Sequence, residues 1–301
     1  METFIIAAGV GLVIGVFSGL LGIGGGTLMV PIFRLGFGMS AIASTATSLF
    51  TIIPTSLVGF VTHLKNKTCI PLVGFLCGIG GACTSPVGVY LASISPSWAI
   101  MLVAALIIGY SSVSMFRKAI RMPKIDARGA SAVTGEDRRR AAEKAAKIQE
   151  EILKTPVSSD KDMQSINHAQ APFTVTPKKV ALCIMIGLGA GLASGYVGVG
   201  GGFIMVPLFI ALLVIPMRQA SGTSLIAVTI LAIPGVIEQG LMGNIDYVAG
   251  LAMAVGSIPG AILGANLIHR IPERKLRFIF GAFLLISAVV LLLNELLPLF
   301  V

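Results

Sequence analysis

Long hydrophobic runs separated by short polar stretches dominate the chain. Crossing a bilayer core of about 30 Å takes roughly 20 apolar residues in a helix. The runs that approach or exceed this length are 3–21, 69–92, 97–116, 180–197, 246–268 and 276–293. The short alternating segments of a β-barrel are absent from the sequence. The pattern therefore predicts an all-α polytopic membrane protein.

The hydrophobic pattern occurs twice, with an offset of 176 residues. Residues 15–33 read GVFSGLLGIGGGTLMVPIF, and residues 191–209 read GLASGYVGVGGGFIMVPLF. Glycines spaced by four, at 11–19 and 187–195, predict helix faces that pack closely. A chain of two hydrophobic halves, each interrupted by glycines, is typical of a membrane transporter.

Each half is expected to form five helical segments. They are 3–21, 27–38, 41–62, 69–92 and 97–118 in the first half, and 180–197, 203–215, 219–240, 246–268 and 273–297 in the second. The second segment of each half is too short to span a membrane at 1.5 Å per residue, and it contains Pro31 or Pro207. We expect each to form a Gly-rich re-entrant or broken helix pair with the segment before it. Such non-helical backbone must be covered by protein or line a wet cavity.

Composition changes between the two halves. Only 12% of the 301 residues are charged and the mean hydropathy is +0.93, yet residues 121–179 hold twelve Lys/Arg and eight Asp/Glu. The chain is therefore divided into a first transmembrane repeat, 1–120, a basic linker, 121–179, and a second transmembrane repeat, 180–301. Residues 136–154 of the linker are rich in Ala, Glu, Lys and Arg and predict an exposed helix. A solvated linker is expected, with a regulatory or partner-binding arm as the alternative.

The basic residues predict the orientation in the cell membrane. The stretches 63–68 and 269–277 and the linker are basic, whereas 238–246 is acidic. Because cations concentrate on the cytoplasmic side, the basic stretches and the linker are placed in the cytoplasm and 238–246 outside. The two halves are then inverted repeats with both termini outside. Three or five crossings per half both satisfy this arrangement.

The glycine blocks carry the candidate substrate site. Glycine destabilises a helix interior by about 1 kcal/mol, but it lets the backbone turn sharply and expose N–H groups. A helix begins directly after each block, and its N-terminus favours an anion. Hydroxyls early in the third segment of each half can also donate to an oxyanion, although helix packing is the alternative. The candidate binding residues are Gly24, Gly25, Gly26, Thr47, Ser48, Gly200, Gly201, Gly202, Thr223 and Ser224.

Other chemistry finds little support in the sequence. The four cysteines, Cys69, Cys77, Cys83 and Cys183, form no CxxC pair and lie in or beside apolar runs. They are expected to be packing residues, with a thiol relay for a sulfur substrate as the alternative. The sequence has no GxxxxGK[ST] phosphate loop and no nucleophile–base pair. We therefore expect no enzyme, no cofactor, no metal site and no nucleic-acid partner.

The paired GxGGGxxxVP blocks, at 22–31 and 198–207, and the Thr-Ser pairs that follow them resemble the TauE/SafE family of sulfite exporters and membrane transporter proteins. The resemblance covers both halves. Members are associated with sulfite, sulfoacetate and other organosulfonates, so it implies a secondary transporter of a small sulfur-containing anion. The alternatives are a membrane anion channel and a non-transporting scaffold or sensor. The expected partners are the substrate and the lipid bilayer, and a homodimer is left open.

Overall fold

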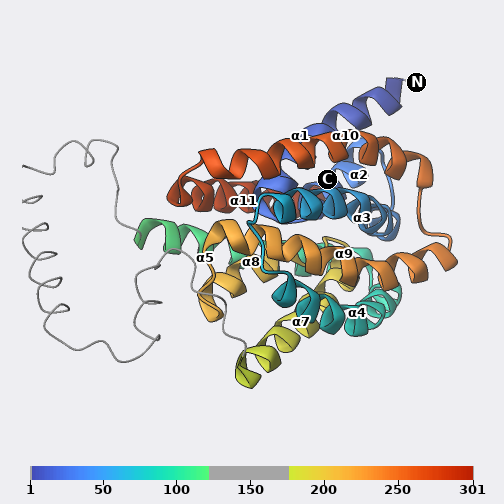
Figure 1. The fold of residues 1–301 in the computed structure, drawn as a ribbon. Helices are drawn as coiled ribbons and strands as arrows, with labels where there is room; N and C mark the ends of the chain where they lie inside the picture. Colours follow the sequence, from blue (N-terminus) through green and yellow to red (C-terminus); the bar gives the residue numbers. More distant parts are fainter. Residues whose placement is uncertain (1, 122–175, 301) are drawn as a thin grey trace, which may run out of the picture. The chain divides into compact units, whose positions relative to one another are not determined.

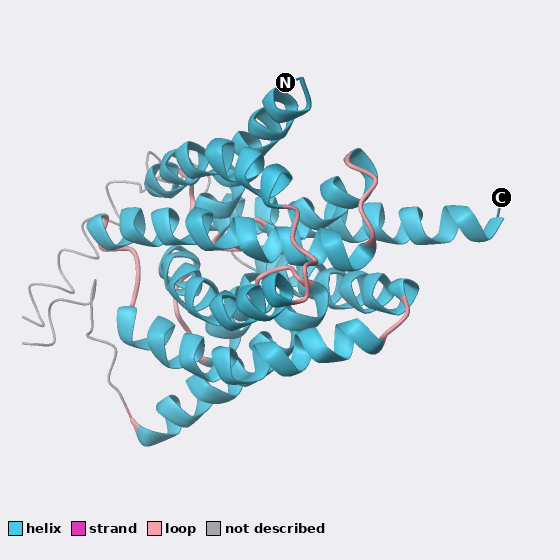
Figure 2. Cartoon of the chain, turned by 90° about the vertical axis from the view of Figure 1, so that its right-hand side faces the viewer, coloured by secondary structure: helices cyan, strands magenta, loops and turns pink. Residues whose placement is uncertain are grey.

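The computed structural model describes residues 2–121 and 176–300, and every regular element in these ranges is a helix (Figures 1 and 2). The first half forms α1 (Glu2–Leu21), α2 (Gly26–Gly36), α3 (Ala41–Lys65), α4 (Pro71–Ile94) and α5 (Ser97–Arg121). The second half forms α7 (Pro177–Val197), α8 (Gly202–Leu212), α9 (Met217–Leu241), α10 (Tyr247–Leu267), the short η1 (Ile268–Arg270) and α11 (Glu273–Phe300). The five predicted segments per half are confirmed, with ends shifted by a few residues.

Residues 1–120 and 175–301 pack into one compact unit, so the two halves share a core. The helix expected at 136–154 lies outside the described residues, and the division at 121–179 stays a prediction.

In the described ranges, seven helices are long and apolar enough to cross a membrane. They are α3, α4, α5, α7, α9, α10 and α11. The apolar part of α1, together with α2 and α8, is shorter. Large side chains such as Leu106, Tyr110 and Ile286 point outward, as expected where lipid replaces water around the protein. The prediction of an all-α polytopic membrane protein is confirmed.

The closest helix pairs join one half to the other. Helix α1 packs along α10, and α7 packs along α4 (Figure 1). A Cβ at Gly15 would overlap the backbone carbonyl of Ser257, and a Cβ at Gly191 would overlap that of Gly81. The two backbones touch, so no other residue fits at these positions. The predicted glycine faces are confirmed, and both pairs are related by the 176-residue offset.

Equivalent helices run in opposite directions. Leu49 of α3 lies against Gly235 of α9, whereas His63 near the end of α3 lies against Gly222 near the start of α9. The helices α3 and α9 are therefore antiparallel. Contacts of the same kind show that α1 and α10 run parallel to α3, and that α4 and α7 run parallel to α9. This is the geometry that inverted repeats require, and the orientation across a bilayer stays a prediction.

The end of α3, the start of α9 and the end of α10 lie together, and we call this region the basic end. The amide Nδ2 of Asn66 donates to Oδ1 of Asn266 at 2.9 Å, and Arg218 Nη2 donates to the carbonyl of Ile271 at 2.9 Å. Its loops and helix ends carry Lys65, Lys67, Arg218, Arg270, Arg274, Lys275 and Arg277. The opposite end, where α9 finishes and α10 begins, carries Glu238 and Asp246.

Candidate functional site

Each glycine block forms a left-handed turn between two helices. The φ angles are +73° at Gly22, +79° at Gly24, +88° at Gly25, +74° at Gly198, +87° at Gly200 and +68° at Gly201. Side chains other than glycine rarely adopt such angles. The short helices α2 and α8 start directly after these turns. The predicted sharp turns are confirmed.

The two turns touch each other. A Cβ at Gly26 would lie 2.5 Å from the carbonyl oxygen of Val199, and a Cβ at Gly202 would lie 2.5 Å from that of Gly22. All residues of both turns are buried. The structure therefore brings Gly24–Gly26 and Gly200–Gly202 together, as the sequence led us to expect.

Side chains from the centres of α3 and α9 hold the turns in place. The hypothetical Cβ of Gly24 would lie 2.8 Å from Cγ1 of Val228 and 3.2 Å from Cγ2 of Ile52. That of Gly200 would lie 2.9 Å from Cδ1 of the same Ile52. Both side chains lie near the middle of their 25-residue helices. The meeting point of the turns is therefore deep within the bundle.

Backbone N–H groups at both turns are available as donors. Among the described residues, no hydrogen bond engages the N–H groups of 23–27, whereas Leu28 and Met29 donate to Gly25. At the second turn, Gly202 donates to Gly200 at 2.8 Å, and the N–H groups of 199–201 have no acceptor in the described chain. Free N–H groups and the positive ends of two helix dipoles favour an anion. The site can thus bind negative charge with uncharged donors.

Thr47 and Thr223 hold helix starts. Oγ1 of Thr47 accepts a hydrogen bond from the N–H of Asp246 at 3.0 Å, and Oγ1 of Thr223 accepts from the N–H of Ile70 at 2.9 Å. These N–H groups precede α10 and α4, so each threonine ties the other half to its own. Sequence reasoning did not foresee this contact. A direct part for the two hydroxyls in substrate binding stays a prediction.

Ser224 and Ser48 occupy equivalent positions but differ in bonding. Oγ of Ser224 donates to the carbonyl of Gly22 at 2.7 Å, so it anchors the first turn. Oγ of Ser48 is fully buried and has no partner in the described chain. This difference separates an anchoring serine from one that is free to bind a ligand.

The position of Ser48 on α3 places it beside the second turn. It follows Thr45 by three residues and precedes Ile52 by four, so the three side chains share one helix face. Thr45 packs against Gly198, and Ile52 packs against Gly200. The free hydroxyl of Ser48 therefore lies on the face of α3 that meets these two glycines.

Other buried hydroxyls near the turns were not among the predicted site residues. Oγ1 of Thr27, in the first turn of α2, and Oγ of Ser18 and Ser194 are fully buried without a partner in the part of the chain that the structure describes. An unsatisfied buried hydroxyl costs roughly 1–3 kcal/mol, so a polar ligand would stabilise this region. One sequence signal could have found Thr27, because its equivalent in the second repeat is the apolar Phe203.

A bundle of membrane-spanning helices in which two half-length helices begin at touching, buried turns has the architecture of a membrane transporter. The chain belongs to the family described as Sulfite exporter TauE/SafE, whose model matches residues 7–291. The predicted family membership is confirmed.

Curated relatives over nearly the full length are similar to the chain. It is 23% identical over 291 residues to the probable membrane transporter protein YunE of Bacillus subtilis (strain 168), covering 94% of this chain and 95% of the relative. It is 24% identical over 298 residues to the probable membrane transporter protein MJ0441 of Methanocaldococcus jannaschii, covering 94% and 93%. No solved structure matches. The chain is a multi-pass membrane transporter.

Proposed function

We propose that this protein is a secondary transporter of small anions, and that it binds sulfite or an organosulfonate such as sulfoacetate at the paired glycine turns. The observation that carries the proposal is the meeting of two buried helix starts whose N–H groups have no acceptor in the described chain. Burying an anion is costly unless donors replace its water. The turns supply such donors, and the family description points to a sulfur oxyanion.

Access to these turns requires helices to move. Every residue of both turns is buried, so the conformation described here is closed around them. The α1–α10 and α4–α7 pairs are locked by backbone contact at their glycines. We infer that each pair moves as a rigid body, and that alternating access comes from one pair rocking against the other.

Flux into vesicles tests the function. Purified protein in vesicles is offered sulfite, sulfoacetate, sulfate and acetate. We expect saturable uptake of a sulfur oxyanion that accelerates when the same anion is preloaded inside, because a transporter exchanges its substrate. Conduction without saturation would instead indicate a channel. The absence of flux for every anion would indicate a scaffold or sensor.

Ser48→Ala and Ser224→Ala form a matched pair for testing the site. Ser48→Ala should weaken binding of the transported anion by about 1–3 kcal/mol, the range for a lost hydrogen bond to a charged group, without lowering stability. Ser224→Ala should lower the stability, because the carbonyl of Gly22 loses its donor. Equilibrium binding and thermal unfolding in detergent measure the two effects. Unchanged affinity in Ser48→Ala would remove this serine from the site.

We also propose that the basic end faces the cytoplasm in the cell membrane, which places the linker inside and both termini outside. The antiparallel course of equivalent helices and the gathering of cations at one end support this orientation. Lys65 and Leu241 are equivalent positions with exposed side chains. Lys65→Cys and Leu241→Cys, each in a background without the four native cysteines, should react with a membrane-impermeant thiol reagent from opposite sides. Labelling from the same side would contradict inverted repeats.

A further inference from the structure

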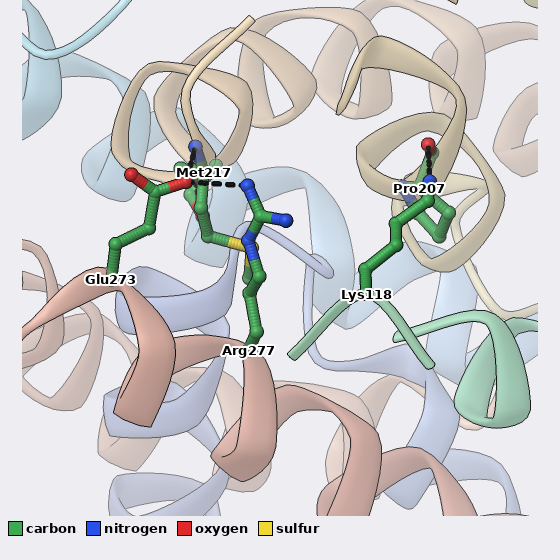
Figure 3. A network of polar contacts seen from close by, with 6 residues as sticks. Lys118, Pro207, Met217, Glu273 and Arg277 are labelled. Carbon is green, nitrogen blue, oxygen red and sulfur yellow. Dashed lines mark hydrogen bonds and ion pairs between the residues drawn. The ribbon is translucent and has the colours of Figure 1, made fainter. Parts of the chain in front are cut away.

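Four cations gather at the basic end, and we call them the cation cluster. It consists of Lys118 near the end of α5, Arg218 at the start of α9, and Arg274 and Arg277 at the start of α11. In Figure 3, Arg277 extends from α11 toward Met217, while Lys118 extends from α5 toward Pro207 of α8. Helices α5 and α11 touch beside these two cations, where the rings of Phe116 and Phe278 lie 6.0 Å apart between centroids.

A single carboxylate balances part of this charge among the described contacts. Oε1 of Glu273 accepts from Nη2 of Arg277 at 2.6 Å and from the N–H of Met217 at 3.1 Å (Figure 3). Among the residues that the structure describes, Lys118 donates to a neutral acceptor, the carbonyl of Pro207, at 3.0 Å. Arg218 likewise donates to a backbone carbonyl. Within the described ranges, four positive charges thus face one negative charge.

Three guanidinium groups of the cluster have an N–H donor without an acceptor among the described residues. The Nε atoms of Arg218, Arg274 and Arg277 are all buried and have no hydrogen-bond partner in the described residues. The guanidinium of Arg274 lies over the ring of Phe278, 5.7 Å from its centroid, which orients it. Buried charged donors without acceptors are costly. An anion with several oxygens would satisfy them, because guanidinium groups match oxyanion geometry.

The repeat shows that the fold does not need cations at these positions. Subtracting 176 from the numbers of Arg218, Arg274 and Arg277 leads to Ile42, Trp98 and Met101 in the first half. Glu273 corresponds to Ser97. The two repeats therefore form equivalent helix starts, with neutral residues in the first half and charged residues in the second. The fold therefore tolerates neutral residues at these positions, and the three arginines are specific to the basic end.

We propose that the cation cluster is a second oxyanion site, which binds a phosphate, sulfate or sulfonate group at the basic end. The site does not depend on binding at the glycine turns. Its ligand is either a free anion or the phosphate of an anionic lipid headgroup. Both present the same group of oxygens to the arginines.

Binding of inorganic phosphate to the purified full-length protein in neutral detergent tests the proposal. Arg274→Gln removes one charge and leaves the Glu273–Arg277 pair intact, and we expect it to weaken phosphate binding about tenfold or more. Lys275→Gln is the matched control, since it removes the same charge from an exposed neighbour on the same helix turn. It should keep wild-type affinity. Gly25→Val, which alters only the turns, should also keep phosphate binding, so the two sites fail separately.

A second measurement distinguishes the sources of the ligand. The wild type, Arg274→Gln and Lys275→Gln are reconstituted in an equal mixture of phosphatidylcholine and phosphatidylglycerol. The lipids that each protein retains are counted by native mass spectrometry. Phosphatidylglycerol retained by the wild type and Lys275→Gln but not by Arg274→Gln would identify a lipid headgroup as the ligand. The proposal would be overturned if Arg274→Gln and Lys275→Gln changed ligand binding equally. It would also be overturned if the wild type bound neither phosphate nor phosphatidylglycerol.

Discussion

Gly25→Val and Gly201→Val should each abolish binding of the transported anion while the protein still folds and reaches the membrane. Both glycines have positive φ, so a side chain costs roughly 1–2 kcal/mol of strain. The new side chain would also cover the N–H groups at the start of α2 or α8. At Gly25 its nearest neighbours are Cε of Met29 at 3.0 Å and Cγ2 of Ile14 at 3.1 Å. At Gly201 the nearest atom is the carbonyl oxygen of Ala190 at 3.1 Å. No distance at either position is below 3.0 Å, so shifts of a few tenths of an ångström accommodate the new Cβ, and the fold should survive.

Two other glycines control this experiment. Gly9→Val adds the same side chain where nothing lies within 4 Å, and it should leave both folding and binding unchanged. Gly22→Ala should prevent folding, because its Cβ would overlap the backbone of Ser221. The measurement is equilibrium binding of sulfite or sulfoacetate to purified protein, with gel filtration in detergent as the test of folding. Wild-type affinity in both turn variants would show that the turns are structural and that the anion binds elsewhere.

Gly191→Val is expected to prevent formation of a stable helical unit, whereas Gly189→Val two residues away should be tolerated. A Cβ at Gly191 would overlap the backbone of Gly81, so α7 and α4 would have to separate. Close backbone approach is what stabilises such pairs in lipid, where apolar side chains gain little by leaving their surroundings. At Gly189 nothing lies within 4 Å of the added Cβ.

Yield and thermal stability in detergent measure the difference between these two α7 variants. Both substitutions have the same helix propensity and hydrophobicity, so only the packing differs. Comparable stability of Gly191→Val and Gly189→Val would contradict the close α4–α7 contact. The equivalent position on α1, Gly15, should be as sensitive as Gly191, because it meets the backbone of Ser257 on α10.

Local chemistry explains why the helices and the turns were predictable. A bilayer requires backbone hydrogen bonds to be made within each segment, so apolar length alone identifies helices such as α4 and α9. Runs of glycine in an otherwise apolar repeat similarly predict a left-handed turn. Gly25 and Gly201 have the positive φ angles that such turns require. Charge also predicted which loops share an end, since the stretches near Lys65 and Arg270 do lie together.

The sequence by itself determined the helical membrane class, the repeat and the two glycine turns, because each depends on residues close together in the chain. Only the tertiary structure decided that Thr47 holds the start of α10 and that Ser224, but not Ser48, is bonded to a turn. The partners in these contacts lie about two hundred residues apart in the chain. Such pairings follow from how the halves interlock, so the pattern within a single segment cannot reveal them.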